Sequence, residues 1–161
     1  MENQSKLRRY RRIIEQLGRL FIKTGDPIAR MASAAALLHF KLEHFFWCGF
    51  YRLHDGDLTV GPYQGPLACP ILARNQGVCW AGINRRQTII VPDVHQFPGH
   101  IACDPRSKSE IVVPVPDRSD NIVAVLDVDS NRKKAFDETD ARELAVIAAL
   151  IYLDDSEKVK E

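Results

Sequence analysis

Three carboxylates near one predicted β-hairpin are the residues of this chain best placed to do chemistry. Glu110 opens the apolar stretch 110–116, and Asp127 and Asp129 close the apolar stretch 121–129. A symmetric hairpin around the intervening loop of about four residues puts Glu110 opposite Asp127. Asp129 joins them, because side chains two apart on a strand share a face. The sequence therefore predicts a patch of three like charges.

Such a patch lowers stability unless a cation, an ammonium group or a retained proton neutralises it. Cys103 lies in the loop just before Glu110, and a thiol beside an acidic pocket suggests sulfur chemistry on a small amine. The simpler alternative is that the carboxylates are solvated at strand ends. A bulge near Pro114 or Pro116 would also shift the register and move Glu110 to the other face.

The chain has four cysteines, at positions 48, 69, 79 and 103. Cys48 lies in the aromatic stretch 45–53, a predicted strand, and is interpreted as a small core residue. The other three lie outside predicted strands. Their spacing lacks the close pair typical of zinc ligands, although His95 and His100 could complete a looser site with Cys103. Three such thiols suit an oxidation cycle in which one attacks, a second resolves the product and a third passes the disulfide onward.

Composition predicts one compact domain over residues 1–161, because the chain is 45% hydrophobic and shows no compositional break. A net charge of +1 gives no overall electrostatic signal for nucleic acid. The basic cluster Lys6, Arg8, Arg9, Arg11 and Arg12 alternates with apolar residues at helical spacing. We interpret this cluster as the solvated face of an amphipathic helix, in preference to a site for an anionic partner.

The sequence shows neither a cleavable signal nor an apolar run long enough to span a membrane. We therefore expect a cytoplasmic protein with no membrane partner. In that reducing compartment the cysteines are expected to be free thiols, metal ligands or redox catalysts.

The predicted elements are two helices, a hairpin, an irregular segment with a short helix after Gly77, a brief strand, a long loop, a second hairpin and a terminal helix. Asp137 caps the terminal helix and Asp140 occupies the N3 position of the capping box. This order predicts an α+β fold, in which helices cover one side of an antiparallel sheet. The stretch 144–151 is apolar nearly all round, which predicts a homodimer.

Several motifs together resemble one known family. They are WCGFY at 47–51, GPYQG at 61–65, AC at 68–69, GVC at 77–79, VPDVH at 91–95, GHIACD at 99–104, SEI at 109–111 and VLDVDS at 125–130. This combination resembles the free methionine-(R)-sulfoxide reductases, which are single GAF domains. The resemblance implies a GAF-like central antiparallel sheet of about six strands, with the N- and C-terminal helices packed on one face. It also implies thiol-dependent reduction of free methionine-(R)-sulfoxide, with thioredoxin as reductant and no cofactor or metal.

The resemblance also implies a role for each cysteine outside the strands. Cys103 would attack the sulfoxide and become a sulfenic acid. Cys79 would resolve that acid by forming a disulfide, and Cys69 would serve as an auxiliary resolving thiol. This chain departs from the family at Trp80, and we expect its bulky ring to affect how Cys79 reaches Cys103.

The implied substrate site contains the predicted carboxylates and an aromatic wall. Glu110, Asp127 and Asp129 would contact the amino group and the sulfoxide oxygen of the substrate. Trp47 and Tyr51 would surround its methyl group, and the backbone N–H groups from Ile101 through Ala102 to Cys103 would hold its carboxylate. The alternative function is that of a non-catalytic GAF module that binds a small ligand for signalling.

Overall fold

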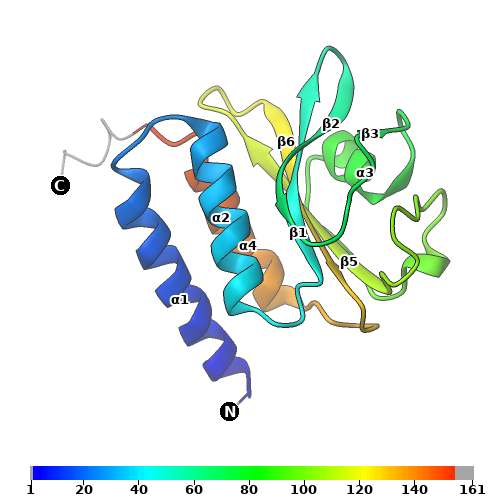
Figure 1. Ribbon diagram of the computed structural model, residues 1–161, viewed down its shortest axis with the longest axis horizontal. Coiled ribbons are helices and arrows are strands. Elements are labelled where there is room, and N and C mark those ends of the chain that lie inside the picture. The colour runs from blue at the N-terminus through cyan, green and yellow to red at the C-terminus, as the bar shows by residue number, and fades with distance from the viewer. Residues whose placement is uncertain (1, 155–161) are drawn as a thin grey trace.

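The computed structural model describes residues 2–154, and in this range a six-stranded sheet is combined with four α-helices (Figure 1). The helices are α1 (Glu2–Phe21), α2 (Pro27–Lys41), α3 (Gly77–Arg85) and α4 (Glu138–Leu150), with a 3-10 turn, η1, at Val94–Gln96. The strands are β1 (Trp47–His54), β2 (Asp57–Gln64), β3 (Ile71–Leu72), β4 (Ile89–Val91), β5 (Ser109–Pro116) and β6 (Ile122–Ser130). Their order across the sheet is β3-β2-β1-β6-β5-β4. The predicted α+β architecture is confirmed.

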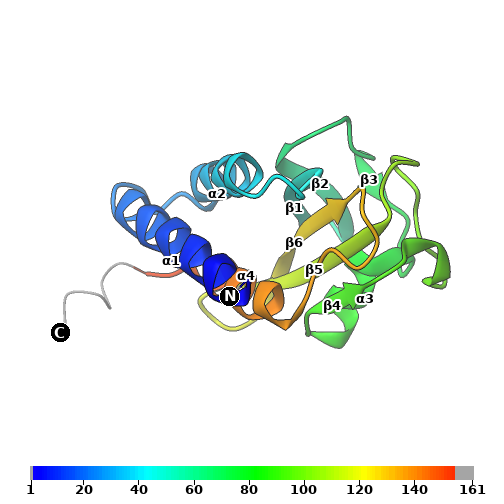
Figure 2. The same cartoon turned by 90° about the horizontal axis from the view of Figure 1, so that it is seen from below.

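The helices divide between the two faces of the sheet. Helices α1, α2 and α4 lie together on one side, whereas α3 lies on the other with the loops around it (Figures 1 and 2). Asp26 caps α2, and Asp137 caps α4 in a capping box with Asp140, as predicted. The part of the chain between residues 2 and 154 contains no helix long and apolar enough to cross a membrane.

The amphipathic interpretation of α1 is confirmed for its arginines but wrong for Lys6. Arg8, Arg9, Arg11 and Arg12 are exposed. Lys6, in contrast, is mostly covered, and its Nζ forms ion pairs with Asp137 and Asp140 at the start of α4. One member of the basic cluster therefore joins α1 to α4.

The register of the second hairpin differs from the symmetric prediction by two residues. Glu110 lies opposite Asp129, and Asp127 lies opposite Val112. Two local features cause the shift. Asn121 joins the loop, where its backbone oxygen accepts from Asp117 at 2.8 Å, and a bulge interrupts the pairing between positions 115 and 116. Because two single shifts add to an even number, Glu110 still shares a face with both aspartates.

Side-chain alternation gives the sheet two different faces. On β6, Leu126 and Val128 join the core under the helices, whereas Asp127 and Asp129 point to the side covered by α3. Cys48 is fully buried in the helix-side core, which confirms its interpretation as a core residue. The two central strands, β1 and β6, therefore present apolar side chains to α1, α2 and α4, and β6 presents its two aspartates on the side of α3.

Candidate active site

The three carboxylates converge on the side of the sheet that α3 covers. Glu110 and Asp127 are each only 5% exposed, and Asp129 is half-buried. Ser107 Oγ donates a hydrogen bond to Asp129 Oδ1 at 2.6 Å. Within residues 2–154, Asp127 Oδ1 is buried without a hydrogen-bond partner. A buried carboxylate oxygen that lacks a donor is positioned to accept one from a ligand.

The pKa values of all three carboxyl groups are raised. Burial, reinforced by the charges of Asp127 and Asp129, raises the pKa of Glu110 well above its ordinary value. Burial raises the pKa of Asp127 to about 6. Burial and the charge of Asp127 raise the pKa of Asp129 well above its ordinary value. The cluster therefore favours retention of protons near neutral pH, which gives it a hydrogen-bond donor as well as acceptors.

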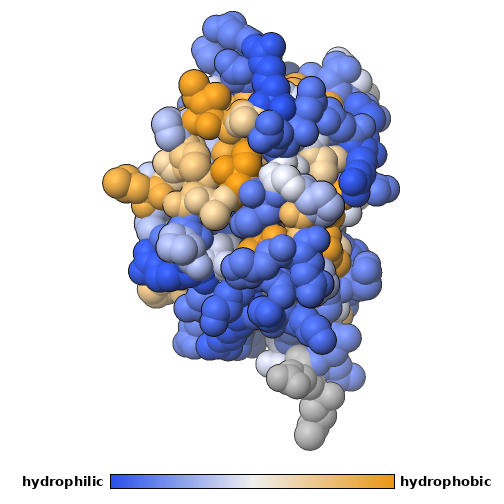
Figure 3. All heavy atoms as spheres, turned by 90° about the vertical axis from the view of Figure 1, so that its right-hand side faces the viewer, coloured by the Kyte–Doolittle hydropathy of each residue, from blue (hydrophilic) through white to orange (hydrophobic). Residues whose placement is uncertain are grey.

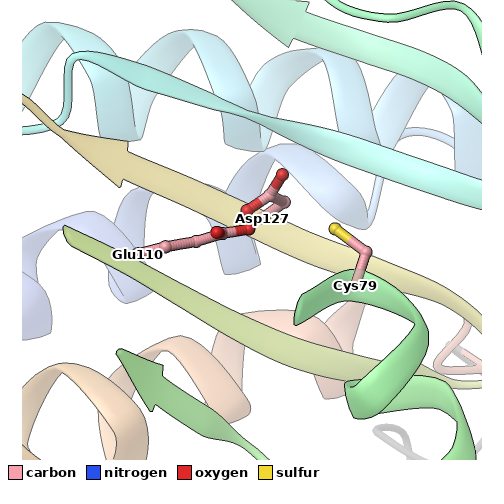
Figure 4. Close-up of side chains that lie close together, drawn as sticks. All are labelled: Cys79, Glu110 and Asp127. Atoms are coloured by element: carbon pink, nitrogen blue, oxygen red, sulfur yellow. The ribbon is translucent and has the colours of Figure 1, made fainter. Parts of the chain in front are cut away.

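Cys79 points from α3 toward the same carboxylates. One ligand atom from each of Cys79, Glu110 and Asp127 lies within 4.8 Å of the others, and the close-up in Figure 4 shows the thiol facing the two acids. Burial and the charge of Asp127 raise the pKa of the Cys79 thiol well above its ordinary value, which favours the neutral thiol. The three groups could converge on a cation or, with protons retained, surround a small polar ligand.

Cys103 forms a disulfide with Cys69, with a Cα–Cα distance of 5.6 Å. The pairing of Cys103 with Cys79, which the family resemblance implied, is therefore not the one that this structure contains: Cys79 is a free, buried thiol. The reason lies in the chain path. Cys69 belongs to the segment between β2 and β3 and meets the loop that carries Cys103, whereas Cys79 is a buried residue of α3.

Trp47 and Tyr51 form an aromatic wall on β1. Trp47 stacks on Tyr51 with ring centroids 5.8 Å apart, and on Tyr63 of β2 with centroids 5.2 Å apart. Gly49 makes room for this stack, since a Cβ there would come within 2.8 Å of the Trp47 ring. Trp47 and Tyr51 stand four residues apart on β1 and share one face of the sheet, as predicted from the alternation of side chains.

The wall also holds the segment that carries Cys69. Trp47 Nε1 donates to the backbone oxygen of Pro66 at 3.1 Å, and the Tyr51 hydroxyl donates to the backbone oxygen of Cys69 at 3.0 Å. Burial raises the pKa of Tyr51, so its hydroxyl remains a donor. The aromatic residues thus fix the position of one disulfide partner.

The sequence-predicted residues gather around one pocket. Its lining includes Trp47, Tyr51, Cys79, Ile101, Cys103, Glu110, Asp127 and Asp129. Cys69 reaches the pocket through its disulfide, and Ala102 is exposed between two lining residues. Within residues 2–154 the backbone N–H groups of Ile101 and Ala102 make no hydrogen bond, whereas that of Cys103 donates to Ile101 O at 3.2 Å.

Two neighbours of the carboxylates were not predicted as site residues. Ser107 bonds to Asp129, and His100 Nδ1 lies 3.8 Å from Glu110 Oε2. Burial lowers the pKa of His100, which favours the neutral ring. The sequence offered His100 only as a ligand of the alternative zinc site and gave Ser107 no role, because position in the long loop before β5 does not say which side chains turn toward the carboxylates.

The alternative zinc site at His95, His100 and Cys103 is not assembled. His95 Nδ1 lies 2.9 Å from Asp93 Oδ1, and Cys103 is in the disulfide. The effect of Trp80 on the reach of Cys79 stays a prediction. The Trp80 ring packs among buried apolar residues on the α3 side of the sheet, and its Nε1 donates to the backbone oxygen of Leu72 at 3.4 Å, so it anchors α3 to β3.

Comparison with known proteins first defines the class. The GAF domain family matches residues 30–152, so this chain is a GAF-domain protein. GAF domain-containing protein A of Dictyostelium discoideum is 41% identical over 148 residues, which cover 91% of this chain and 92% of that protein.

More specific similarities define the family within that class. The free methionine-R-sulfoxide reductase of Escherichia coli is 41% identical over 122 residues, which cover 76% of this chain and 73% of that protein. The structure of a free methionine-R-sulfoxide reductase from Neisseria meningitidis, in complex with its substrate, matches with a TM-score of 0.86 and 37% identity, covering 91% of this chain and 88% of that one. The chain therefore belongs to the free methionine-R-sulfoxide reductases, a family of oxidoreductases.

Proposed function

We propose that this chain reduces free L-methionine-(R)-sulfoxide to methionine. The observation that carries the proposal is a disulfide at the edge of a pocket whose floor contains three carboxyl groups with raised pKa values. Reduction of one sulfoxide takes two electrons, and oxidation of two thiols to a disulfide supplies them. The carboxyl groups supply an anionic partner for an ammonium group and a proton donor for an oxygen.

Recognition of a free amino acid follows from the charges around the pocket. The substrate ammonium group binds the carboxyl group that ionises at the lowest pH. We assign this role to Asp127, because one of its buried oxygens has no hydrogen-bond partner among residues 2–154 and can accept from the ammonium group. The substrate carboxylate binds the backbone N–H groups of Ile101 and Ala102. The methyl group contacts Trp47 and Tyr51. A methionine sulfoxide within a peptide lacks both charges, leaves these groups unpaired and is rejected.

The proposed reduction begins with attack of the Cys103 thiolate on the sulfoxide sulfur. The S–O bond breaks, the oxygen transfers to Cys103 as a sulfenic acid, and methionine leaves with its sulfur reduced by two electrons. The departing oxygen needs protons, and Glu110 or Asp129 donates one because each retains it near neutral pH.

The disulfide supports Cys69 as the resolving thiol. Its thiolate attacks the Cys103 sulfenic acid, the S–O bond breaks, water leaves and the Cys69–Cys103 disulfide forms. Cys79, which the family resemblance made the resolving thiol, is instead proposed to stay a protonated thiol beside Glu110 and Asp127.

Several further features belong to the same proposal. Thioredoxin is the proposed reductant of the disulfide, and the reducing cytoplasm is the proposed compartment. Residues 1–161 act as one GAF domain without a cofactor, and two copies form a homodimer.

A coupled assay with NADPH, thioredoxin reductase and thioredoxin tests the activity. We expect turnover of free methionine-(R)-sulfoxide and at least a hundredfold lower kcat/KM for the same sulfoxide with acylated nitrogen and amidated carboxylate. Equal rates on the free and capped substrates would contradict the recognition mechanism. Stabilisation by the free sulfoxide without any reduction would instead favour the non-catalytic sensory module.

A further inference from the structure

Two large hydrophobic side chains flank Cys69 and are exposed to solvent. Leu67 is 87% exposed and Ile71 is 56% exposed, each two residues from the cysteine. Figure 3 views the side of the molecule on which β3 and α3 lie, and hydrophobic side chains gather at the upper left of that view within a mostly hydrophilic surface. A single exposed leucine is ordinary, but a pair beside a disulfide that must react is a candidate contact surface.

The outward position of Leu67 is built into the fold. The residues on either side of it along the segment are fixed from within, since Trp47 donates to the Pro66 oxygen and Tyr51 donates to the Cys69 oxygen. Leu67 also lines the pocket, so its exposed side chain lies at the mouth of the site. The segment therefore holds this hydrophobic side chain at the solvent-exposed edge of the pocket, next to the cysteine.

We propose that Leu67 and Ile71 form a docking surface for a protein dithiol reductase of the thioredoxin class. The biological role of this surface rests on the proposed function, because each catalytic cycle leaves the Cys69–Cys103 disulfide oxidised. One thiolate of the partner attacks a sulfur of that disulfide, the S–S bond breaks, and the other cysteine leaves as a thiolate. The second partner thiolate then attacks the mixed disulfide, so that the partner is oxidised and both cysteines are reduced.

The position of the disulfide favours a partner that covers Leu67 and Ile71. One side of the disulfide adjoins the substrate pocket, and the sequence on both sides of Cys69 carries an exposed apolar side chain. A protein that brings a thiolate to bonding distance of the disulfide has to bury these neighbours, whereas a small dithiol does not. Apolar contact at the centre of a small interface is the usual source of its binding energy.

Reduction of the purified oxidised protein tests the proposal without any sulfoxide. The second-order rate constant is measured with reduced thioredoxin and, separately, with dithiothreitol, for the wild type, Leu67→Ser and Ile71→Ser. We expect thioredoxin to react roughly tenfold more slowly with each variant, and dithiothreitol to reduce Ile71→Ser at the wild-type rate. Phe40→Ser is the matched control, because Phe40 is 78% exposed on α2, across the sheet.

Three outcomes would overturn the docking surface. Thioredoxin rates that are unchanged in both variants would place the contact elsewhere. An equal loss with dithiothreitol would show a change in the disulfide itself, and a change in oligomeric state on sedimentation would assign the surface to a second copy of the chain. Failure of the proposed function is a separate result, because it appears as a lack of sulfoxide turnover even with dithiothreitol.

Discussion

The two faces of the sheet differ in whether their buried charged groups have partners of opposite charge or hydrogen-bond partners. On the helix side, Arg30 is 1% exposed and donates to backbone carbonyl oxygens in the α1–α2 turn and at the end of α4. Asp140 is fully buried there and pairs with Lys6 and the Tyr10 hydroxyl. On the pocket side, no lysine or arginine in residues 2–154 pairs with Glu110 or Asp127.

This difference indicates a division of labour within one domain. The helix side combines an apolar core, which stabilises the fold, with hydrogen-bonded partners for the buried Arg30 and Asp140. The pocket side leaves buried carboxyl groups without cations, which lowers stability but prepares them for a ligand with an ammonium group. The helix-side core supplies the stability that allows the pocket side to remain strained in the absence of substrate.

The largest expected effect contrasts two cysteines on opposite faces. Cys103→Ser should abolish sulfoxide turnover, because it removes the thiol proposed to attack the sulfoxide, whereas Cys79 beside the carboxylates is buried and its raised pKa favours the unreactive neutral thiol. Cys48→Ala should keep nearly the wild-type rate and instead lower the free energy of unfolding by about 1 kcal/mol, since it removes a small group from the core. Steady-state kinetics and urea unfolding measure both. Wild-type activity in Cys103→Ser, or loss of activity in a folded Cys48→Ala, would contradict the proposal that catalysis takes place on the pocket side and that Cys48 only packs in the core.

The next effect concerns the carboxyl groups. Glu110→Gln keeps a hydrogen-bond donor but loses the carboxyl group. It should lower kcat/KM roughly 5- to 150-fold, which corresponds to a loss of about 1 to 3 kcal/mol of transition-state stabilisation. Asp129→Ala should lose more, because it also removes the partner of Ser107. Asp120→Asn in the hairpin loop is the control, since that side chain is 87% exposed. An unchanged rate in Glu110→Gln would mean that Glu110 does not contact the substrate.

The same substitution should stabilise the substrate-free protein in a pH-dependent way. Burial raises the pKa of Glu110 in the folded state, so its contribution to stability is full below the unfolded pKa of about 4.3 and declines as pH rises above it. The Glu110→Gln variant has no carboxyl group to ionise at this position, so its free energy of unfolding lacks this decline with pH. Its stability advantage should therefore grow by up to about 1.4 kcal/mol per pH unit above about pH 4. Thermal unfolding of both proteins from pH 4 to 8 measures this, and parallel profiles would contradict the raised pKa.

The smallest effect on activity is expected from the outer face of α4. Ala145, Val146 and Ala149 are exposed there, and Val146 is 42% exposed. We expect a homodimer by sedimentation, and Val146→Asp should shift it toward monomer while turnover stays near the wild-type rate. A wild-type protein that is monomeric at high micromolar concentration would rule out this surface as a dimer contact.

Local patterns in the sequence were sufficient to predict most of the fold. The α4 capping box, the core position of Cys48 and the shared face of Glu110, Asp127 and Asp129 all follow from short-range rules. The hairpin register was only partly predicted. Pro116 marked the position of the bulge, but the extra loop residue, which returns Glu110 to the shared face, leaves no clear mark in the sequence. The two-residue strand β3 was missed for its shortness.

The disulfide shows the limit of prediction at the site itself. Which cysteine pairs with Cys103 depends on where the segment between β2 and β3 crosses the loop that carries Cys103, and this is a property of the folded chain. Spacing along the sequence says nothing about it. The contacts of Ser107 and His100 with the carboxyl groups were missed for the same reason, since they depend on the path of an irregular loop.

A single turnover shows both whether this chain reduces the sulfoxide and which cysteine pairs with Cys103. Fully reduced protein is mixed with excess free methionine-(R)-sulfoxide without any external reductant, and methionine is quantified while the disulfide is mapped by digestion and mass spectrometry. The account predicts about one methionine per chain and a new bond between Cys69 and Cys103. Absence of methionine, or a disulfide that joins Cys79 to Cys103, would contradict it.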